Sequence, residues 1–134
     1  MYGDSYLTCP FESVRAAFDA SKQPALMTVF RNDNRWDRSN VLFKNGEILV
    51  YDKSASLPDM HYIDYGLGIL SSRVLLTYPS DTPFDLARVY QDQLRAGQLT
   101  GYDVGTRFYE IGSPAGLEET RQYLATRRRR DPNS

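Results

Sequence analysis

The chain has 134 residues, of which 41% are hydrophobic and 25% charged, and this balance fits one globular domain with a buried core. A formal net charge of −1 lacks the excess of positive charge that is typical of nucleic-acid-binding proteins. No apolar run approaches the length that spans a membrane. The single cysteine, Cys9, excludes an intramolecular disulfide, and with no recognisable signal peptide we expect a cytoplasmic protein.

The first elements are expected to be a strand, a helix and a second strand. Tyr2 to Leu7 has the character of the end of a buried strand, and Asp4 is the residue at which that strand is expected to end. Pro10, whose missing N–H costs little in a first turn, begins a helix that runs to about Lys22. Residues 25–30 then form an apolar run of strand length.

A hairpin over residues 39–53 is the clearest local prediction. Asn45-Gly46 supplies the two positive φ angles of a type I′ turn, and the flanking runs have strand character. The next strand, over residues 61–70, contains Gly66 and Gly68. Glycine inside a strand often marks a close approach of the backbone to a ligand, so we expect one here.

The remaining elements, in chain order, are a helix over 84–96 with Gly97 as its C-cap, strands over 99–104 and 108–111, and a last helix with Ser113 as its N-cap. This order predicts an α/β fold, a mixed β-sheet with flanking helices. We expect one domain over residues 1–130 and a disordered tail over residues 131–134.

Several catalytic devices are missing from the sequence. There is no glycine-rich phosphate loop of the Walker or dinucleotide type and no serine in a nucleophile elbow. His61 is the only histidine, which excludes a multi-histidine metal site and makes a packed or surface role the better interpretation. The cluster from Arg127 to Arg130 is better interpreted as a solvated helix end than as a nucleic-acid site.

Acidic residues near strand ends are the remaining candidates for chemistry. They are Asp4, Asp52, Asp64 and Glu110. In open α/β sheets ligands gather at the carboxyl ends of strands, and two converging carboxylates there can hold Mg²⁺. Lys53 adds a point charge suited to phosphate. From the residues alone, however, a solvated surface charge remains the better interpretation of each acid.

Five segments, in register along nearly the whole chain, resemble the C-terminal half of a sugar-1-phosphate nucleotidyltransferase. They are Tyr2–Leu7, the hairpin from Ser39 through Asn45-Gly46 to Asp52-Lys53, Tyr62–Gly66, the helix from Phe84 to Leu99, and Phe108–Pro114. The segments Asp64-Tyr65-Gly66 and Arg107–Gly112 are most similar to guanylyltransferases that act on mannose- or heptose-type sugar phosphates. The resemblance implies part of a Rossmann-like nucleotide-diphospho-sugar transferase fold, with a sugar 1-phosphate and a nucleoside triphosphate as substrates.

The resemblance also implies roles for individual residues. Asp4 and Glu110 would hold Mg²⁺, and Lys53 would bind the phosphate of the sugar. Asp52 would accept hydrogen bonds from sugar hydroxyls. The other substrate-binding residues that it implies are Asn40, Asp64, Tyr65 and Gly66. No membrane or nucleic-acid partner is implied.

Two departures from the family pattern affect these roles. Glu110 stands where the family has Asp, and its extra methylene moves the carboxylate by roughly 1.5 Å, the length of one carbon–carbon bond. The glycine-rich loop that grips the triphosphate would precede the Asp4 segment and is not in this sequence.

Three interpretations follow. The chain is a nucleotidyltransferase fragment that needs a front half, a non-catalytic sugar-phosphate-binding or assembly module, or a purely structural α/β domain. The first predicts that the strand of Asp4 is an exposed sheet edge, which invites an N-terminal half or a second copy to pair with it. The second predicts a covered edge and a closed core.

Overall fold

The computed structural model describes residues 3–55 and 57–130, with side chains as far as residue 128. The elements are β1 (Ser5–Tyr6), α1 (Phe11–Ser21), β2 (Ala25–Arg31), β3 (Val41–Lys44), β4 (Glu47–Tyr51), β5 (Tyr62–Leu70), α2 (Ser72–Leu75), α3 (Leu86–Arg95), β6 (Leu99–Asp103), β7 (Tyr109–Glu110) and α4 (Pro114–Arg130). Tyr2, which belongs to the first predicted strand, and the predicted tail 131–134 lie outside the described residues.

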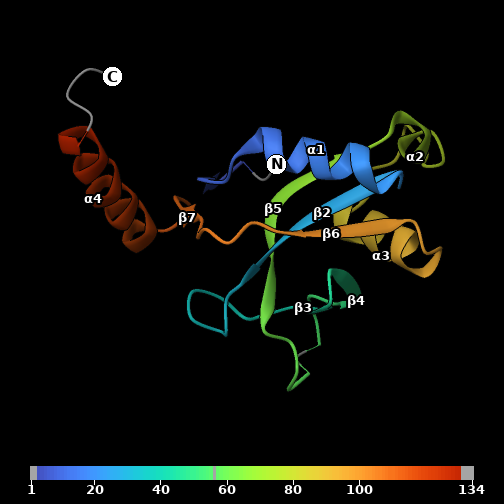
Figure 1. Cartoon of the computed structure of the whole chain (residues 1–134), viewed down its shortest axis with the longest axis horizontal. Coiled ribbons are helices and arrows are strands. Elements are labelled where there is room, and N and C mark those ends of the chain that lie inside the picture. Colours follow the sequence, from blue (N-terminus) through green and yellow to red (C-terminus); the bar gives the residue numbers. More distant parts are fainter. Residues whose placement is uncertain (1–2, 56, 131–134) are drawn as a thin grey trace.

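The strands form one mixed sheet of five strands, in the order β4-β3-β5-β2-β6, and one sheet of two strands, β1-β7 (Figure 1). In the larger sheet β2 is parallel to β6 and antiparallel to β5, and β3 is antiparallel to both β4 and β5. The predicted mixed α/β sheet is therefore confirmed. In the small sheet, β1 and β7 are antiparallel.

Helices cover both faces of the larger sheet. Leu26 and Phe30 of β2 point to a core shared with Val14 of α1, whereas Met27 and Val29 point to a second core shared with Tyr90 of α3. This division follows the two-residue period of a strand, which sends alternate side chains to opposite faces. The continuous apolar run of β2 is thus explained by burial on both sides.

Local signals predicted the turns and caps well. Asn45 and Gly46 have φ angles of 54° and 83°, as a type I′ turn requires. Gly97 lies just after α3 with a φ of 67°, and the Ser113 hydroxyl accepts a hydrogen bond of 3.1 Å from the Gly116 N–H in the first turn of α4. The four-residue helix α2 was not predicted, because so short an element has no periodic pattern.

Two expectations were wrong. Asp4 does not end a strand: it lies in a turn directly before β1, because pairing with β7 begins only at Ser5. At Gly68 the group that approaches the backbone is a side chain of this protein and not a ligand. A Cβ atom on Gly68 would lie 1.8 Å from the Tyr90 hydroxyl, so the α3 ring occupies the space that the glycine leaves.

Helix α4 is attached at its N-terminal end and points away from the sheets (Figure 1). Within the side chains described for α4, Thr120 is the only buried one. Tyr123 stacks on Tyr109 of β7 with ring centroids 4.2 Å apart. None of the helices in the described part of the chain combines the length and the apolar character that crossing a bilayer needs.

Candidate functional site

A cleft of about 420 Å³ opens between the small sheet, the loop over residues 32–40 and the end of the β3–β4 hairpin. It brings together segments that are far apart in the sequence. Its lining residues include six that the sequence predicted as site residues: Asp4, Asn40, Lys53, Asp64, Tyr65 and Glu110. Asp37, Arg38 and Phe108 also line it and were not predicted. Asp52 and Gly66 do not line it.

The acidic wall of the cleft is made by the pairing of β1 with β7. Ser5 lies opposite Glu110, and the Ile111 N–H donates a 2.8 Å hydrogen bond to the Asp4 main-chain oxygen. A Cβ atom on Gly112 would lie 2.8 Å from Oε1 of Glu110 and 3.5 Å from Oδ2 of Asp4. The two carboxylates therefore approach the same point beside the backbone of Gly112.

The first turn of α4 holds Glu110 in place. The Ser113 hydroxyl donates a 2.8 Å hydrogen bond to Oε2 of Glu110. A Cβ atom on Gly116 would lie 2.3 Å from the Glu110 main-chain oxygen, so the helix packs directly on this residue. The side chain of Glu110 is thus oriented by a helix cap as well as by the strand that carries it.

Asn40 and Asp64 form the floor of the cleft. Oδ1 of Asn40 accepts a 3.0 Å hydrogen bond from the Asp64 N–H. The Asp64 carboxylate, which is buried, accepts bonds of 2.9 Å from the Tyr51 hydroxyl and 3.0 Å from the Gly66 N–H. Gly66 has a φ of 90°, a conformation that glycine adopts without strain. These bonds fix the floor before any ligand arrives.

Asp52 closes the turn that follows β4. Its Oδ1 accepts hydrogen bonds from the N–H and hydroxyl of Ser54, at 2.8 and 2.6 Å, and from the Ala55 N–H at 3.2 Å. The side-chain hydrogen bond from Ser54 is the largest cause that lowers the pKa of Asp52. The turn places Lys53 at the cleft, so Asp52 contributes to the site by shaping the chain there.

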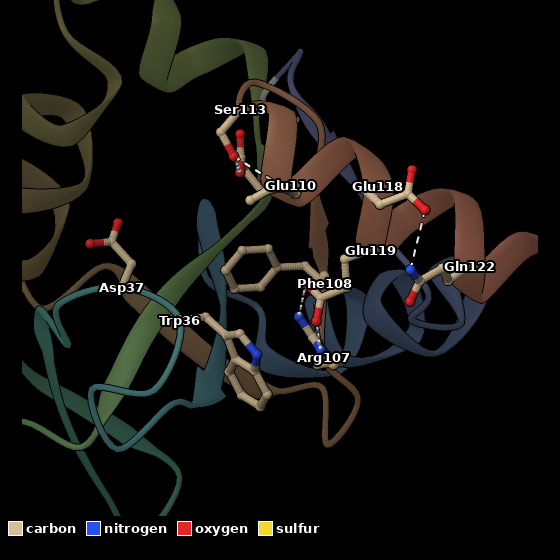
Figure 2. Close-up of a pocket in the computed structure, with 11 residues that line it drawn as sticks. Trp36, Asp37, Arg107, Phe108, Glu110, Ser113, Glu118, Glu119 and Gln122 are labelled. Carbon is tan, nitrogen blue, oxygen red and sulfur yellow. Dashed lines mark hydrogen bonds and ion pairs between the residues drawn. The ribbon is translucent and has the colours of Figure 1, made fainter.

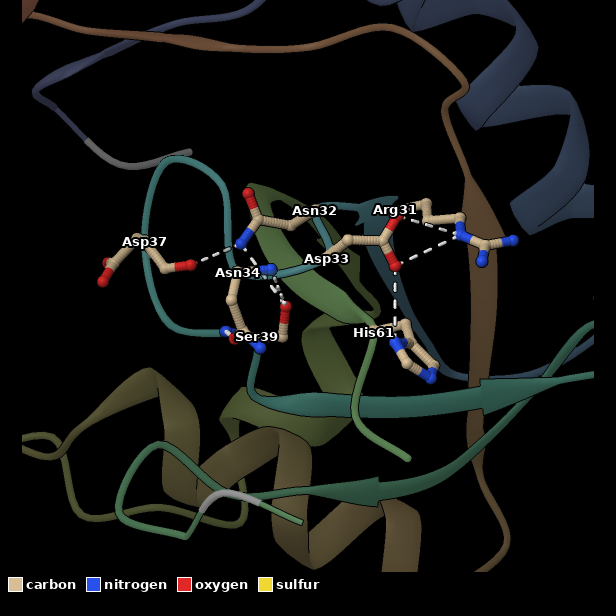
Figure 3. Close-up of polar contacts among 7 residues, drawn as sticks. All are labelled: Arg31, Asn32, Asp33, Asn34, Asp37, Ser39 and His61. Atoms are coloured by element: carbon tan, nitrogen blue, oxygen red, sulfur yellow. Dashed lines mark hydrogen bonds and ion pairs between the residues drawn. The ribbon is translucent and has the colours of Figure 1, made fainter. Parts of the chain in front are cut away.

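The loop over residues 32–40 is built around a buried polar network that the sequence did not reveal (Figure 3). The side-chain amide of Asn32, which is fully buried, donates to the Asp37 main-chain oxygen and accepts from the Trp36 N–H at 3.3 Å. Ser39 is also fully buried, and its N–H donates to the Asn34 side chain at 2.8 Å. This network fixes the loop that presents Asp37, Arg38 and Asn40 to the cleft.

A second cavity, of about 690 Å³, adjoins the cleft on the α4 side and shares Asp37, Phe108 and Glu110 with it. Figure 2 shows Arg107 between the Trp36 ring and helix α4. Its guanidinium lies 4.3 Å from the Trp36 ring centroid and donates two hydrogen bonds, of 2.9 and 3.0 Å, to Glu119. Arg107 therefore joins the loop to the helix across this cavity.

Tyr65 ties the β1 side of the cleft to the segment before β7. Its hydroxyl accepts a 3.1 Å hydrogen bond from the Thr8 N–H and donates at 3.4 Å to the Arg107 main-chain oxygen. The neighbouring thiol of Cys9 is buried, and that burial raises its pKa. Tyr65 thus lines the cleft and also holds its walls together.

The donor set fits a hard divalent cation. Residues 3–55 and 57–130 contain no group of three or more His, Cys, Asp or Glu side chains that could bind a metal. Mg²⁺ does not need such a group, because it is usually bound by one or two carboxylates together with substrate phosphates and water. Asp4 and Glu110, which both line the cleft and approach the same point beside Gly112, are such a pair.

No protein-family model and no curated protein matches this chain. Solved structures do match it, and two of them are described below. One, from Bacillus anthracis, is described as a glucose-1-phosphate thymidylyltransferase in complex with a sucrose; the likeness has a TM-score of 0.77 and 16% identity and covers 90% of this chain and 51% of that one. The other is the inositol-1-phosphate CTP transferase from T. maritima, with a TM-score of 0.68 and 22% identity, covering 92% of this chain and 52% of that one.

At these identities the likeness shows a shared fold. The chain thus has the fold of part of a sugar-phosphate nucleotidyltransferase, as the sequence predicted, and it spans about half the length of the two structures that it matches.

Proposed function

We propose that this chain forms the sugar-phosphate and metal side of a sugar-1-phosphate nucleotidyltransferase and is inactive until a second polypeptide segment supplies the nucleotide side. The observation that carries the proposal is the cleft itself. Acidic, amide and basic residues meet in it, and they come from the turn before β1, the loop before β3, the turn after β4, and strands β5 and β7. A sugar phosphate bound with a cation needs that combination of groups.

The reaction joins an oxygen of the sugar phosphate to the α-phosphorus of a nucleoside triphosphate. The bond from that phosphorus to the bridging oxygen breaks, and pyrophosphate leaves with the electron pair. The protein mainly positions and neutralises charged groups in such a transfer. When bound, Mg²⁺ would offset the negative charge of the phosphates.

Each residue of the cleft has a proposed task. Asp4 and Glu110 hold the cation, and Lys53 places its ammonium against the phosphate of the sugar. Asn40, whose side-chain oxygen is bonded to the Asp64 N–H, turns its amide nitrogen to a sugar hydroxyl. Asp64 and Tyr65 keep the floor of the cleft rigid, so binding costs little conformational entropy.

Binding to the isolated chain tests the metal site. Mn²⁺, used as a paramagnetic substitute for Mg²⁺, should bind to the chain in an electron-paramagnetic titration. Asp4→Asn and Glu110→Gln should each weaken it at least about tenfold. Asp59→Asn is the control, because this exposed carboxylate pairs with Lys44 at 3.6 Å, remote in the fold from β1 and β7. Equal affinities in all four proteins would place the metal elsewhere.

Two further measurements test the reaction class. Lys53→Gln should weaken binding of mannose 1-phosphate, but not of mannose, and Lys44→Gln is its matched control. A pyrophosphate-release assay should show no turnover by the chain alone and turnover when the missing half of the fold is added. Sustained turnover by the chain alone would contradict the half-enzyme proposal.

A further inference from the structure

Arg38 is a cation of the cleft whose charge no residue of the described chain neutralises. It lines the cleft together with Asp37, and its main-chain N–H donates a 2.6 Å hydrogen bond to Oδ1 of that residue. No carboxylate within residues 3–55 and 57–130 forms an ion pair with its guanidinium. A guanidinium has five N–H donors and no acceptor. Arg38 therefore offers an unpaired positive charge to a ligand in the cleft.

The main chain on both sides of Arg38 is fixed by the buried network of the loop (Figure 3). The Asp37 main-chain oxygen accepts a hydrogen bond from the fully buried side chain of Asn32. The N–H of Ser39, which is also fully buried, donates to the Asn34 side chain at 2.8 Å. Arg38 is thus anchored between two fixed neighbours, although its own side chain is exposed. A ligand that meets this side chain does not have to order the backbone that carries it.

Main-chain pairing brings the segments of Arg38 and Lys53 together. The Asp52 N–H donates a 3.0 Å hydrogen bond to the Asn40 oxygen, which extends the pairing of β3 with β4 beyond the two strands. Arg38 lies two residues before Asn40 and Lys53 directly follows Asp52, so the two cations reach the cleft from neighbouring segments. Hydrogen bonds from Ser54 are the largest causes that lower the pKa of the Asp52 carboxyl, and the positive charge of Arg38 adds to them. The guanidinium therefore lies within electrostatic range of the turn that carries Lys53.

The charges that line the cleft favour two cations for the binding of a sugar phosphate. A phosphate monoester carries a charge of about −1.5 to −2 at pH 7. The charged lining residues are the acids Asp4, Asp37, Asp64 and Glu110 and the cations Lys53 and Arg38. Four carboxylates against two cations give a formal charge of −2, which the divalent ion of the proposed metal site would offset. With Lys53 as the only cation the cleft would stay negative and would repel the phosphate.

We propose that Arg38 is a second phosphate-binding residue of the cleft, and that its guanidinium and the Lys53 ammonium hold the phosphate of the sugar between them. The guanidinium can donate two parallel N–H bonds to two phosphate oxygens, whereas the ammonium acts as a compact point charge. The two residues together therefore select a phosphate monoester over a neutral sugar. This role of Arg38 rests on the proposed function, because it concerns the same ligand in the same cleft.

Isothermal titration calorimetry of the chain with mannose 1-phosphate and with mannose, both in the presence of Mg²⁺, tests this role. Arg38→Gln should weaken the binding of mannose 1-phosphate at least about tenfold, as Lys53→Gln should, and leave the binding of mannose unchanged. Arg35→Gln is the matched control, because Arg35 is exposed on the same loop and does not line the cleft. Equal fluorescence anisotropy of Trp36 in all four proteins would show that the loop is intact.

The other outcomes overturn the role of Arg38, and they separate it from the proposed function. If only Lys53→Gln weakens the binding of mannose 1-phosphate, the proposed function stands and Arg38 has no part in it. If Arg38→Gln weakens mannose and mannose 1-phosphate equally, Arg38 does not act on the phosphate. An equal loss in Arg35→Gln would reduce the effect to the overall charge of the loop. If the wild type binds mannose 1-phosphate no more tightly than mannose, the proposed function fails as well.

Discussion

Oδ2 of Asp4 and Oε1 of Glu110 approach the same point above Gly112, at 3.5 and 2.8 Å from the position that a Cβ atom would take there. Residues from opposite ends of the chain thus form one acidic site, because β1 pairs with β7 in a register that places Ser5 opposite Glu110. The space that the glycine leaves is part of the site.

Gly112→Ala should therefore disturb the acid pair without unfolding the protein. The added methyl group would force the Glu110 carboxylate away, and we expect Mn²⁺ affinity to fall about tenfold. Isothermal titration calorimetry measures the change. Gly3→Ala is the control, since a Cβ atom there would meet nothing within 4 Å. Unchanged affinity in the Gly112 variant would show that the two carboxylates do not bind the metal together.

Asn32→Ala should loosen the loop that carries Asp37 and Arg38. The change removes partners of the Trp36 N–H and the Asp37 oxygen in a fully buried position, which costs about 1–3 kcal/mol. Trp36 is the only tryptophan, so its fluorescence anisotropy reports the loop directly. Anisotropy should fall in this variant and stay unchanged in Arg35→Ala, whose side chain is exposed. A rigid Trp36 in both variants would contradict the role of Asn32.

Gly68→Ala should destabilise the fold strongly, because its Cβ atom would overlap the Tyr90 hydroxyl at 1.8 Å. We expect a loss of about 1–3 kcal/mol in the free energy of unfolding, measured by urea denaturation. Adding Tyr90→Phe to this variant removes the nearest atom and should recover part of the loss. No recovery would mean that contact with the β2 backbone, where the Leu26 oxygen lies 3.1 Å away, sets the cost.

The Arg107–Glu119 pair should make stability depend on pH in the acid range. Hydrogen bonds from Arg107 hold the pKa of Glu119 below its ordinary value of 4.5. A depressed folded-state pKa stabilises the protein above the ordinary value, and this contribution is lost as the pH falls below about 4.5. Because both side chains are partly exposed, it should not exceed about 1 kcal/mol.

Thermal unfolding of the wild type and of Glu119→Gln at pH 6 and pH 3.5 measures this contribution. The variant should lose less stability between the two pH values than the wild type does. In the background of Arg107→Gln, the Glu119 change should no longer alter the pH dependence. An identical loss in wild type and Glu119→Gln would show that the pair does not stabilise the fold.

The parts of the fold that depend on neighbouring residues could be predicted from the sequence. Asn45-Gly46 determines its turn through backbone angles, and Ser113 caps its helix through a bond three residues away. The Gly68 case shows the limit of such reasoning: a glycine reports a close approach but not the approaching group, and here Tyr90 comes from another helix.

The site could be predicted only in part, and for a related reason. The resemblance singled out Asp4 and Glu110, and the structure brings them together, while their metal-binding role stays a prediction. The sugar-binding role of Asp52 stays a prediction; the turn that its Oδ1 closes was not predicted, because the pattern does not show where a short acidic side chain finds its nearest N–H. The contact of Arg107 with Trp36 depends on two loops meeting, which no local pattern encodes.

Because α4 is attached beside the cleft and points away from it, a small movement at the cleft produces a larger displacement at the far end of the helix. Its first turn rests on Glu110, Glu119 pairs with Arg107, and Tyr123 stacks on Tyr109, so a tilt of the small sheet would carry the helix with it. The 17 residues of the helix extend for about 25 Å, so a tilt of about 10° would move the far end by about 4 Å, much more than any atom near the carboxylate. A spin label at Arg128, distant from the chemistry, would therefore report when the acid pair changes its position.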